Sequence, residues 1–312
     1  MPVLSVILPS YNEQKNISNT AQVLSGLLEK NGIDYELIFV SDGSVDGTYE
    51  TVCEEARKNS HVKGLEFSRN FGKEASIFAG LSVAVGDACV VMDCDLQHPP
   101  EVIPQMYELW KQGYEVVEGK KSSRGKESLF HRVFAGLFYG IMSKLIKMDM
   151  KDSSDFKLLD RKVVNVLLDL KERNTFFRAL TFWAGFRSTS VSYEVQERKY
   201  GESKWSYRSL FKYAIQNATS FSTLPLQLVT MMGVICIIFS ILLAIQTLVK
   251  YFMGTAEKGF PTVILLILIV GGFIMISLGI IGHYLARIYE EVKGRPKYII
   301  KQMTDNIQGH MK

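Results

Sequence analysis

The sequence has few cysteines and one long stretch that is almost free of charge. Its four cysteines form no CxxC pair, so they match neither a zinc site nor a disulfide-stabilised secreted domain. The soluble part is therefore expected in a reducing compartment. The chain has 36 Lys and Arg and 32 Asp and Glu, but only three of these lie within residues 213–286. This charge gap excludes a wholly soluble protein and a disordered chain.

Two apolar segments within this stretch are each long enough to cross a bilayer, which requires roughly 20 apolar residues. We predict transmembrane helices at about 226–252 and 261–285, within a hairpin of residues 223–287. The alternative is a pair of helices buried in a large soluble core. Helices of that kind rarely run so far without a charged residue, so an antiparallel transmembrane hairpin is the better interpretation.

The basic residues indicate the orientation of this hairpin. Lys and Arg are concentrated in residues 198–212 and after residue 286, whereas the connecting loop has only Lys250 and Lys258. The positive-inside rule then places both termini in the cytoplasm. The start MPVLSVILPSYNE has no basic n-region and too short an apolar run for a signal peptide. We predict a multi-pass protein of the cell membrane, with a cytoplasmic catalytic domain at 1–222 and a basic cytoplasmic tail at 288–312.

Two basic segments, residues 120–147 and 198–212, stand out within an otherwise acidic domain. They overlap stretches at about 128–146 and 204–222 in which apolar residues recur at helical spacing, and we predict amphipathic helices there. Such helices suit the membrane interface, although the first would serve equally well as a core helix. Membrane phosphate is therefore the expected partner of the basic segments, and nucleic acid is not expected.

Strand and helix patterns alternate through the first 120 residues. This alternation predicts an α/β fold with a parallel sheet, whose ligands lie beyond the carboxyl ends of the strands. The expected strands are 4–8, 36–40, 63–67 and 88–92, and the expected helices are 15–30, 48–58, 73–85 and 100–112.

Polar residues follow each of these four strands, in the segments PSYNE (9–13), SDGSVDGT (41–48), SRN (68–70) and DCDLQ (93–97). The chain has neither GxxxxGK[ST] nor GxGxxG, so it is neither a P-loop ATPase nor a dinucleotide enzyme. Asp93 and Asp95 are two residues apart at a strand end and could bind one hard divalent cation together with Gln97. A DxD sequence alone is weak evidence, because solvated loops often contain one.

The order and strand-end placement of VILPSYNE, VSDGSVDGT, SRNFGKE and DCDLQHPP resemble glycosyltransferase family 2. The later segments DSSDFKLLDR (152–161) and RKYGESKW (198–205), with the hairpin, are similar to those of polyprenyl-phosphate glycosyltransferases. The resemblance covers nearly the whole chain. It implies a GT-A type nucleotide-sugar-binding domain, which is Rossmann-like with a mostly parallel sheet.

The resemblance also implies a reaction, in which a sugar is transferred with inversion from a nucleoside-diphosphate sugar to polyprenyl (undecaprenyl) phosphate for cell-envelope glycans. UDP-glucose and UDP-N-acetylglucosamine are the leading donors, ahead of GDP-mannose. Asp93, Asp95 and Gln97 would hold Mg²⁺ or Mn²⁺, which stabilises the charge on the leaving diphosphate. The residues implied to bind the nucleotide sugar are Pro9, Tyr11, Glu13, Asp42, Lys73 and Asp93.

Asp155 and Asp95 are the catalytic residues that the resemblance implies, and Asp155 matches the position of the catalytic base. A phosphate monoester has a second pKa near 6 and is already ionised at neutral pH, so Asp155 could position the acceptor instead. Cationic side chains near the membrane are needed to offset repulsion between two anionic substrates. The candidates that bind the acceptor phosphate are Arg124, Arg198 and Lys204, with Ser128 and Ser203 as further hydrogen-bond donors.

Two other interpretations are considered. A processive polysaccharide synthase would need a glycan channel and the QxxRW motif, and this chain lacks the motif and has few spans. A non-catalytic membrane scaffold would have no reason to keep acidic residues at several strand ends. Relatives with this hairpin imply a homotetramer packed through it, and a flippase and a further glycosyltransferase would act downstream.

Overall fold

The computed structural model describes residues 3–121, 154–172, 176–194, 224–254 and 259–307. The chain forms two compact units, one containing residues 1–209 and 296–312 and the other residues 210–295. The predicted helices at about 128–146 and 204–222 lie outside the described residues.

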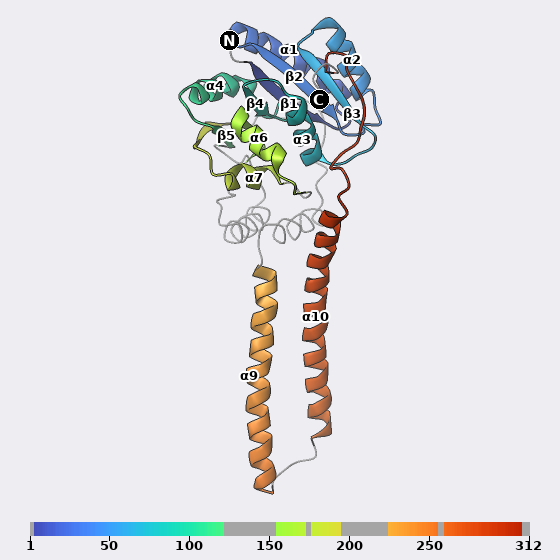
Figure 1. The fold of residues 1–312 in the computed structure, drawn as a ribbon, viewed down its shortest axis with the longest axis vertical. Coiled ribbons are helices and arrows are strands. Elements are labelled where there is room, and N and C mark those ends of the chain that lie inside the picture. The colour runs from blue at the N-terminus through green and yellow to red at the C-terminus, as the bar shows by residue number, and fades with distance from the viewer. Residues whose placement is uncertain (1–2, 122–153, 173–175, 195–223, 255–258, 308–312) are drawn as a thin grey trace. The chain divides into compact units, whose positions relative to one another are not determined.

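The first unit is built on one mixed sheet (Figure 1), in which the described strands follow the order β7-β5-β6-β4-β1-β2-β3-β8. Its centre, β4-β1-β2-β3, is parallel, whereas β6 runs antiparallel to β4 and β5, and β8 antiparallel to β3. This confirms the predicted α/β fold. The strands are β1 (Leu4–Ser10), β2 (Tyr35–Ser41), β3 (Val62–Phe67), β4 (Ala88–Val91), β5 (Val116–Lys121), β6 (Lys157–Asp160), β7 (Ser188–Tyr193) and β8 (Ile300–Met303).

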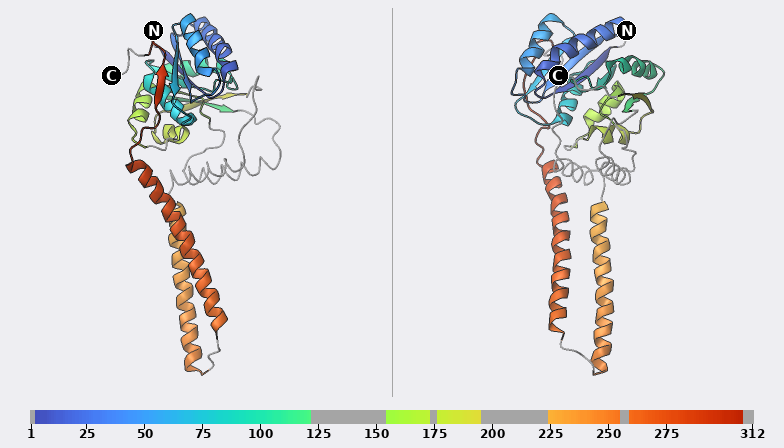
Figure 2. Two further views of the ribbon diagram at one scale, coloured as in Figure 1. Left: turned by 90° about the vertical axis from the view of Figure 1, so that its right-hand side faces the viewer. Right: turned by 180° about the vertical axis from the view of Figure 1, so that it is seen from behind.

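Helices cover both faces of this sheet (Figure 2). Leu4, Val6 and Leu8 of β1 belong to the same buried cluster as the apolar side of α1. Ile7 points to the opposite face, where a Cβ on Gly80 of α3 would come within 2.3 Å of its side chain. Burial on both faces explains why β1 is a nearly continuous apolar run. The helices are α1 (Gln14–Lys30), α2 (Thr48–Lys58), α3 (Lys73–Val83), the 3-10 turn η1 (Pro100–Val102), α4 (Ile103–Lys111), α6 (Arg161–Asp169) and α7 (Phe177–Trp183).

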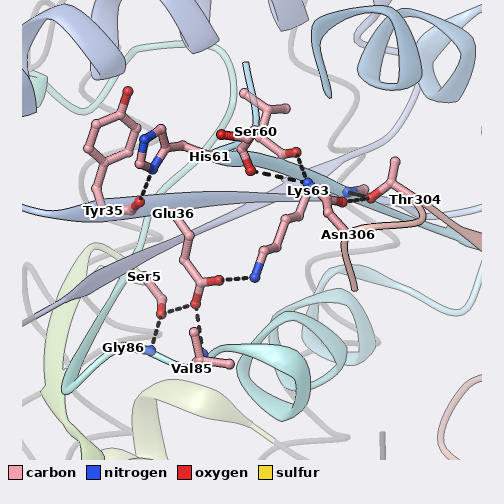
Figure 3. Close-up of polar contacts among 12 residues, drawn as sticks. Ser5, Tyr35, Glu36, Ser60, His61, Lys63, Val85, Gly86, Thr304 and Asn306 are labelled. Atoms are coloured by element: carbon pink, nitrogen blue, oxygen red, sulfur yellow. Dashed lines mark hydrogen bonds and ion pairs between the residues drawn. The ribbon is translucent and has the colours of Figure 1, made fainter. Parts of the chain in front are cut away.

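The carboxyl-terminal segment closes one edge of the sheet, which the sequence analysis did not predict. β8 pairs with β3, and the next residue, Thr304, exchanges hydrogen bonds with the backbone of Gly64. The side-chain amide of Asn306 donates to the carbonyls of Ser60 and Val62 (Figure 3). Part of the expected basic tail is therefore an edge strand of the first unit.

A buried ion pair joins β2 to β3 within this unit (Figure 3). The ammonium of Lys63 lies 2.7 Å from the Glu36 carboxylate, which also accepts hydrogen bonds from the Ser5 hydroxyl and from the backbone N–H of Val85. Both charged side chains are almost fully buried. Each charge therefore depends on the other, because neither has water to replace its partner.

The second unit contains two long apolar helices, α9 (Leu224–Phe252) and α10 (Phe260–Val292). The segments Val229–Lys250 and Ile269–Val292 have mean hydropathies of 2.5 and 1.9 and are long and apolar enough to cross a membrane. Their apolar side chains are largely exposed, which is unlike the core helices of a soluble protein. The second helix continues beyond its predicted end. The direction of insertion stays a prediction.

We predict that Lys63→Met lowers the free energy of unfolding by about 3–5 kcal/mol, because it leaves Glu36 buried without its counter-charge. Chemical denaturation of the full chain, followed by tryptophan fluorescence, measures the change. The matched control is Lys111→Met, which removes the lysine of an exposed pair with Glu108. That control is expected to change stability by less than about 1 kcal/mol. Equal effects of the two substitutions would contradict the prediction.

Candidate functional site

The sheet brings two aspartates together from distant parts of the sequence. β4 and β6 are antiparallel, and Val91 pairs with Lys157. Asp93 follows β4 by two residues and Asp155 precedes β6 by two residues, so the register places them at the same edge of the sheet. β1 is parallel to β4, and β2 is parallel to β1, so the carboxyl ends of both strands lie at this edge as well. The sequence alone did not reveal the antiparallel insertion of β6.

Lys73, the first residue of α3, connects the two aspartates. Its ammonium lies 2.5 Å from Asp93 Oδ1 and 2.8 Å from Asp155 Oδ2. The Lys73 side chain is 40% exposed, whereas that of Asp155 is 6% exposed. Lys73 therefore has one side toward solvent, where an anionic substrate could reach it, while its charge also stabilises two carboxylates.

Arg178 of α7 makes the other contacts of Asp155 and was not among the residues predicted from the sequence. Its Nε lies 2.6 Å from Asp155 Oδ1 and its Nη2 lies 3.0 Å from Oδ2. Such a forked pair fixes the plane of a carboxylate as well as neutralising it. Glu74, also missed, accepts a hydrogen bond of 2.9 Å from the backbone N–H of Phe177. The only sequence signal for Arg178 was a charge in the apolar run FFRALTFW.

Electrostatics keep both aspartates ionised. Burial alone would raise the pKa of Asp155, but the charges of Arg178 and Lys73 outweigh it and hold that pKa well below its usual value. Burial is likewise outweighed at Asp93, where Lys73 contributes most to lowering the pKa. The two carboxylates raise the pKa of Lys73, against the effect of burial. A carboxylate with so low a pKa is a poor proton acceptor at neutral pH.

Asp42 reaches this site indirectly, through the loop that leads into α3. Its two carboxylate oxygens accept hydrogen bonds from the backbone N–H groups of Phe71 and Gly72, at 2.6 and 2.9 Å. Burial raises the pKa of Asp42, although these hydrogen bonds lower it. The neighbouring Gly43 has φ +61°, and a Cβ there would lie 2.2 Å from the Arg69 backbone. Asp42 thus shapes the loop that presents Lys73, in addition to any contact with nucleotide.

Of the residues expected after the first strand, Tyr11 and Glu13 lie in the turn between β1 and α1, which packs against the start of α2. Pro9 is half-buried within β1, and the side chain of Tyr11 is 42% exposed. The backbone N–H of Glu13 donates to the Thr48 hydroxyl, and the Glu13 carboxylate accepts from the Asn16 amide at 2.5 Å. Binding of a nucleotide by these residues stays a prediction.

The turn after β4 holds the expected cation ligands. Asp95 Oδ1 accepts a hydrogen bond from the backbone N–H of Gln97, and Leu96 between them has φ +56°. His98 accepts from the backbone N–H of Asp93 and stacks on Phe156. Among the described residues, no three His, Cys, Asp or Glu side chains are grouped to hold a metal. Asp93 and Asp95 supply oxygen donors of the kind that Mg²⁺ and Mn²⁺ prefer, and binding of a cation by them together with substrate phosphates stays a prediction.

The proposed acceptor-binding residues, Arg124, Ser128, Arg198, Ser203 and Lys204, lie outside the part of the chain that the structure describes. Their roles stay predictions. Within the described part, the structure brings Lys73, Asp93, Asp155 and Arg178 into one connected group of charges.

Comparison with known proteins identifies the family of the chain. The model of Glycosyl transferase family 2 matches residues 5–165, which is about half of the chain and includes Lys73, Asp93 and Asp155. The chain belongs to glycosyltransferase family 2. The chain is therefore a glycosyltransferase, as predicted from its strand-end motifs.

Two relatives match this glycosyltransferase over nearly its whole length. It is 39% identical to the uncharacterized glycosyltransferase YkcC of Bacillus subtilis, over 96% of this chain and 93% of the relative. It is 37% identical to the SfII prophage-derived bactoprenol glucosyl transferase of Shigella flexneri, over 96% of this chain and 97% of the relative. A crystal structure of glucosyl-3-phosphoglycerate synthase from Mycobacterium tuberculosis is similar with TM-score 0.49 and 20% identity, over 70% of this chain and 77% of that one.

The environment of Glu74 predicts that the stability of the folded protein depends on pH. Burial, together with the nearby Asp155 charge, raises the pKa of Glu74 to about 8. The folded state therefore binds this proton more tightly than the unfolded state, whose ordinary pKa is about 4.5. The stabilisation from this proton is complete below pH 4.5 and is lost as the pH rises through 8, by up to about 1.4 kcal/mol per pH unit.

We predict that the thermal midpoint of the glycosyltransferase falls between pH 6 and pH 8, and that it falls less in Glu74→Gln, which carries no titrating group. Differential scanning fluorimetry of the full chain in detergent measures both profiles. The control Glu108→Gln removes an exposed carboxylate and should keep the wild-type pH dependence. Parallel profiles for wild type and Glu74→Gln would show that Glu74 is ionised throughout this range.

Proposed function

We propose that this glycosyltransferase transfers a sugar, with inversion, from a nucleoside-diphosphate sugar to polyprenyl phosphate. The observation that carries the proposal is the similarity to a bactoprenol glucosyl transferase, which extends over 97% of that protein. The two helices long and apolar enough to cross a membrane lie within the shared length. A soluble donor and a lipid acceptor both suit a chain with a sheet unit and an apolar hairpin. The name of this relative favours glucose, so UDP-glucose is our first choice of donor.

The charges at the site suit a reaction between two anions. Lys73 carries the positive charge that is partly open to solvent, and the donor diphosphate would bind there as the bond to the sugar breaks. A divalent cation held by Asp93 and Asp95 would supply further positive charge for the leaving diphosphate. Gln97 is the neutral oxygen ligand that we propose beside them.

The acceptor phosphate is the nucleophile, and it needs no base to activate it, because its second pKa is about 6. Asp155 has a lowered pKa and both of its oxygens are already hydrogen-bonded. Its proposed role is to position the acceptor or the sugar hydroxyls rather than to remove a proton. Attack from the face opposite the leaving diphosphate inverts the anomeric carbon. Arg124, Arg198, Lys204 and Ser128 are the proposed ligands of the acceptor phosphate.

The cellular setting completes the proposal. We propose insertion of the hairpin in the cell membrane with the sheet unit and both termini in the cytoplasm, where nucleotide sugars are available. We propose that the chain assembles as a homotetramer. The other proposed partners are a flippase and a second glycosyltransferase, which use the lipid-linked sugar. The proposed boundaries remain 1–222, 223–287 and 288–312.

The first test uses the purified full chain with undecaprenyl phosphate and radiolabelled UDP-glucose, UDP-N-acetylglucosamine or GDP-mannose. We expect label from UDP-glucose in an organic-extractable, acid-labile lipid, and nucleotide release in equal amount. Label in an insoluble polymer would instead support a processive synthase. Absence of lipid-linked label from every donor would refute the proposed acceptor.

We predict that Asp155→Asn lowers turnover by about 100-fold or more, at the upper end of effects typical of groups that act in proton transfer or positioning. Donor binding, measured by titration with UDP, should change little. Near-normal turnover of the variant would contradict either role.

We also predict that Asp95→Ala and excess EDTA each abolish transfer, and that added Mn²⁺ or Mg²⁺ restores activity only after EDTA. The physical reason is that the leaving diphosphate loses its main counter-charge. Glu108→Ala, an exposed acidic residue on α4, is the control and should stay active. Full activity in excess EDTA would refute a metal-dependent reaction.

A further inference from the structure

The forked contact between Arg178 and Asp155 determines the orientation of this carboxylate. Arg178 donates from Nε to one oxygen of Asp155 and from Nη2 to the other, so one edge of the guanidinium binds both carboxylate oxygens. A lysine could supply the charge but not this pair of parallel donors. Lys73 adds a third donor to Oδ2. Rotation of the Asp155 carboxylate would break all three contacts.

The backbone around Asp155 is held separately from its side chain. The Ser154 hydroxyl donates to the carbonyl of Gly119 at 2.7 Å and accepts from the N–H of Phe156 at 3.2 Å. Phe156 is fully buried. Loss of Arg178 would therefore remove both donors of the fork and leave the contact with Lys73, without removing the contacts that hold the Asp155 backbone.

Arg178 in turn is held in place by α3. The backbone N–H of Phe177 donates to Glu74, and the side chain of Phe177 is fully buried. Glu74 is adjacent in sequence to Lys73, so the start of α3 supplies one residue that contacts Asp155 and another that anchors its arginine partner. The contacts from α3 and α7 converge on the same carboxylate.

Lys73 and Arg178 bind Asp155 in different ways. Lys73 bridges Asp155 to Asp93 and so belongs to the proposed donor and cation site as well. The forked contact of Arg178 is made to Asp155, the carboxylate to which the proposal assigns a role in the reaction. A change at Lys73 should therefore affect donor binding and turnover together, whereas a change at Arg178 should mainly affect turnover.

We infer that Arg178 is a positioning residue for sugar transfer, which acts by fixing the Asp155 carboxylate in its working orientation, and that Glu74 supports it by anchoring the start of α7. The inference rests on the proposed function, because it assigns Arg178 a role in the same reaction. It adds a residue from α7 to a site otherwise formed by strand ends and α3.

The test is a double-mutant cycle between Arg178 and Asp155, measured as nucleotide release and as lipid-linked sugar. We expect Arg178→Gln to lower kcat by about 30-fold with less than about a 3-fold change in donor KM. Asp155→Asn should cost about 100-fold, and the double variant should be no worse than Asp155→Asn alone. Losses that multiply to about 3000-fold would show that Arg178 acts independently of Asp155, and would overturn the inference.

Two further variants separate positioning from charge and from folding. Arg178→Lys keeps the charge without the fork, so it should recover only a minor part of the lost kcat; full recovery would overturn the positioning role. Arg161→Gln is the matched control, because Arg161 also donates from two nitrogens to one group, the carbonyl of Gly86, and is also half-buried, with a further contact to Cys89 Sγ. Its kcat should stay within about 2-fold of wild type.

Folding and the proposed function are checked independently. Thermal midpoints and UDP binding identify any variant that does not fold, and if Arg178→Gln fails, the cycle is run with Arg178→Lys. Nucleotide release without lipid product in the wild type would refute the proposed acceptor, and the cycle on nucleotide release would still test Arg178. An unchanged kcat in a folded Arg178→Gln would overturn the inference whatever the acceptor.

Discussion

The site depends on one constraint, which is that a buried carboxylate must be surrounded by positive charge. Asp155 is nearly fully buried, and burial of an isolated carboxylate is strongly unfavourable. Lys73 and Arg178 offset this cost, and they come from α3 and α7, which are about 100 residues apart in the sequence. Correct folding of both helices is therefore coupled to the ionised state of Asp155. Lys73, one of these two cations, is also the residue that we propose to bind the donor diphosphate.

The topology of the sheet explains how these parts meet. The parallel strands β1, β2 and β4 deliver their carboxyl ends to one edge, as in other α/β proteins. β6 runs in the opposite direction beside β4, so the residues before β6 reach that same edge. An all-parallel sheet would have placed Asp155 at the opposite end, far from Asp93. The site therefore requires that β6 run antiparallel to β4.

The sequence predicted the parts of this structure that local patterns determine. β1 to β4 are short apolar runs followed by polar turns, and the two long apolar helices follow from their lack of charge. Asp93, Lys73 and Asp155 were identified from motifs, as the resemblance to family 2 implied. Arg178 and Glu74 were missed as site residues because their importance comes from contacts across 23 and 103 residues of sequence, although Glu74 ends the segment SRNFGKE that carried the resemblance.

β8 shows the same limit and has a further consequence for the hairpin. Its four residues follow α10 and include the charged Lys301 and the amide Gln302, so their sequence resembles a solvated tail. Their pairing with β3 covers an edge whose backbone groups would otherwise be open to another strand. Thr304 and Asn306 fix the register through Gly64, Ser60 and Val62. Because residues on both sides of the hairpin belong to the sheet unit, the apolar helices are a loop inserted into that unit, and the unit is complete only after the chain has passed through both helices.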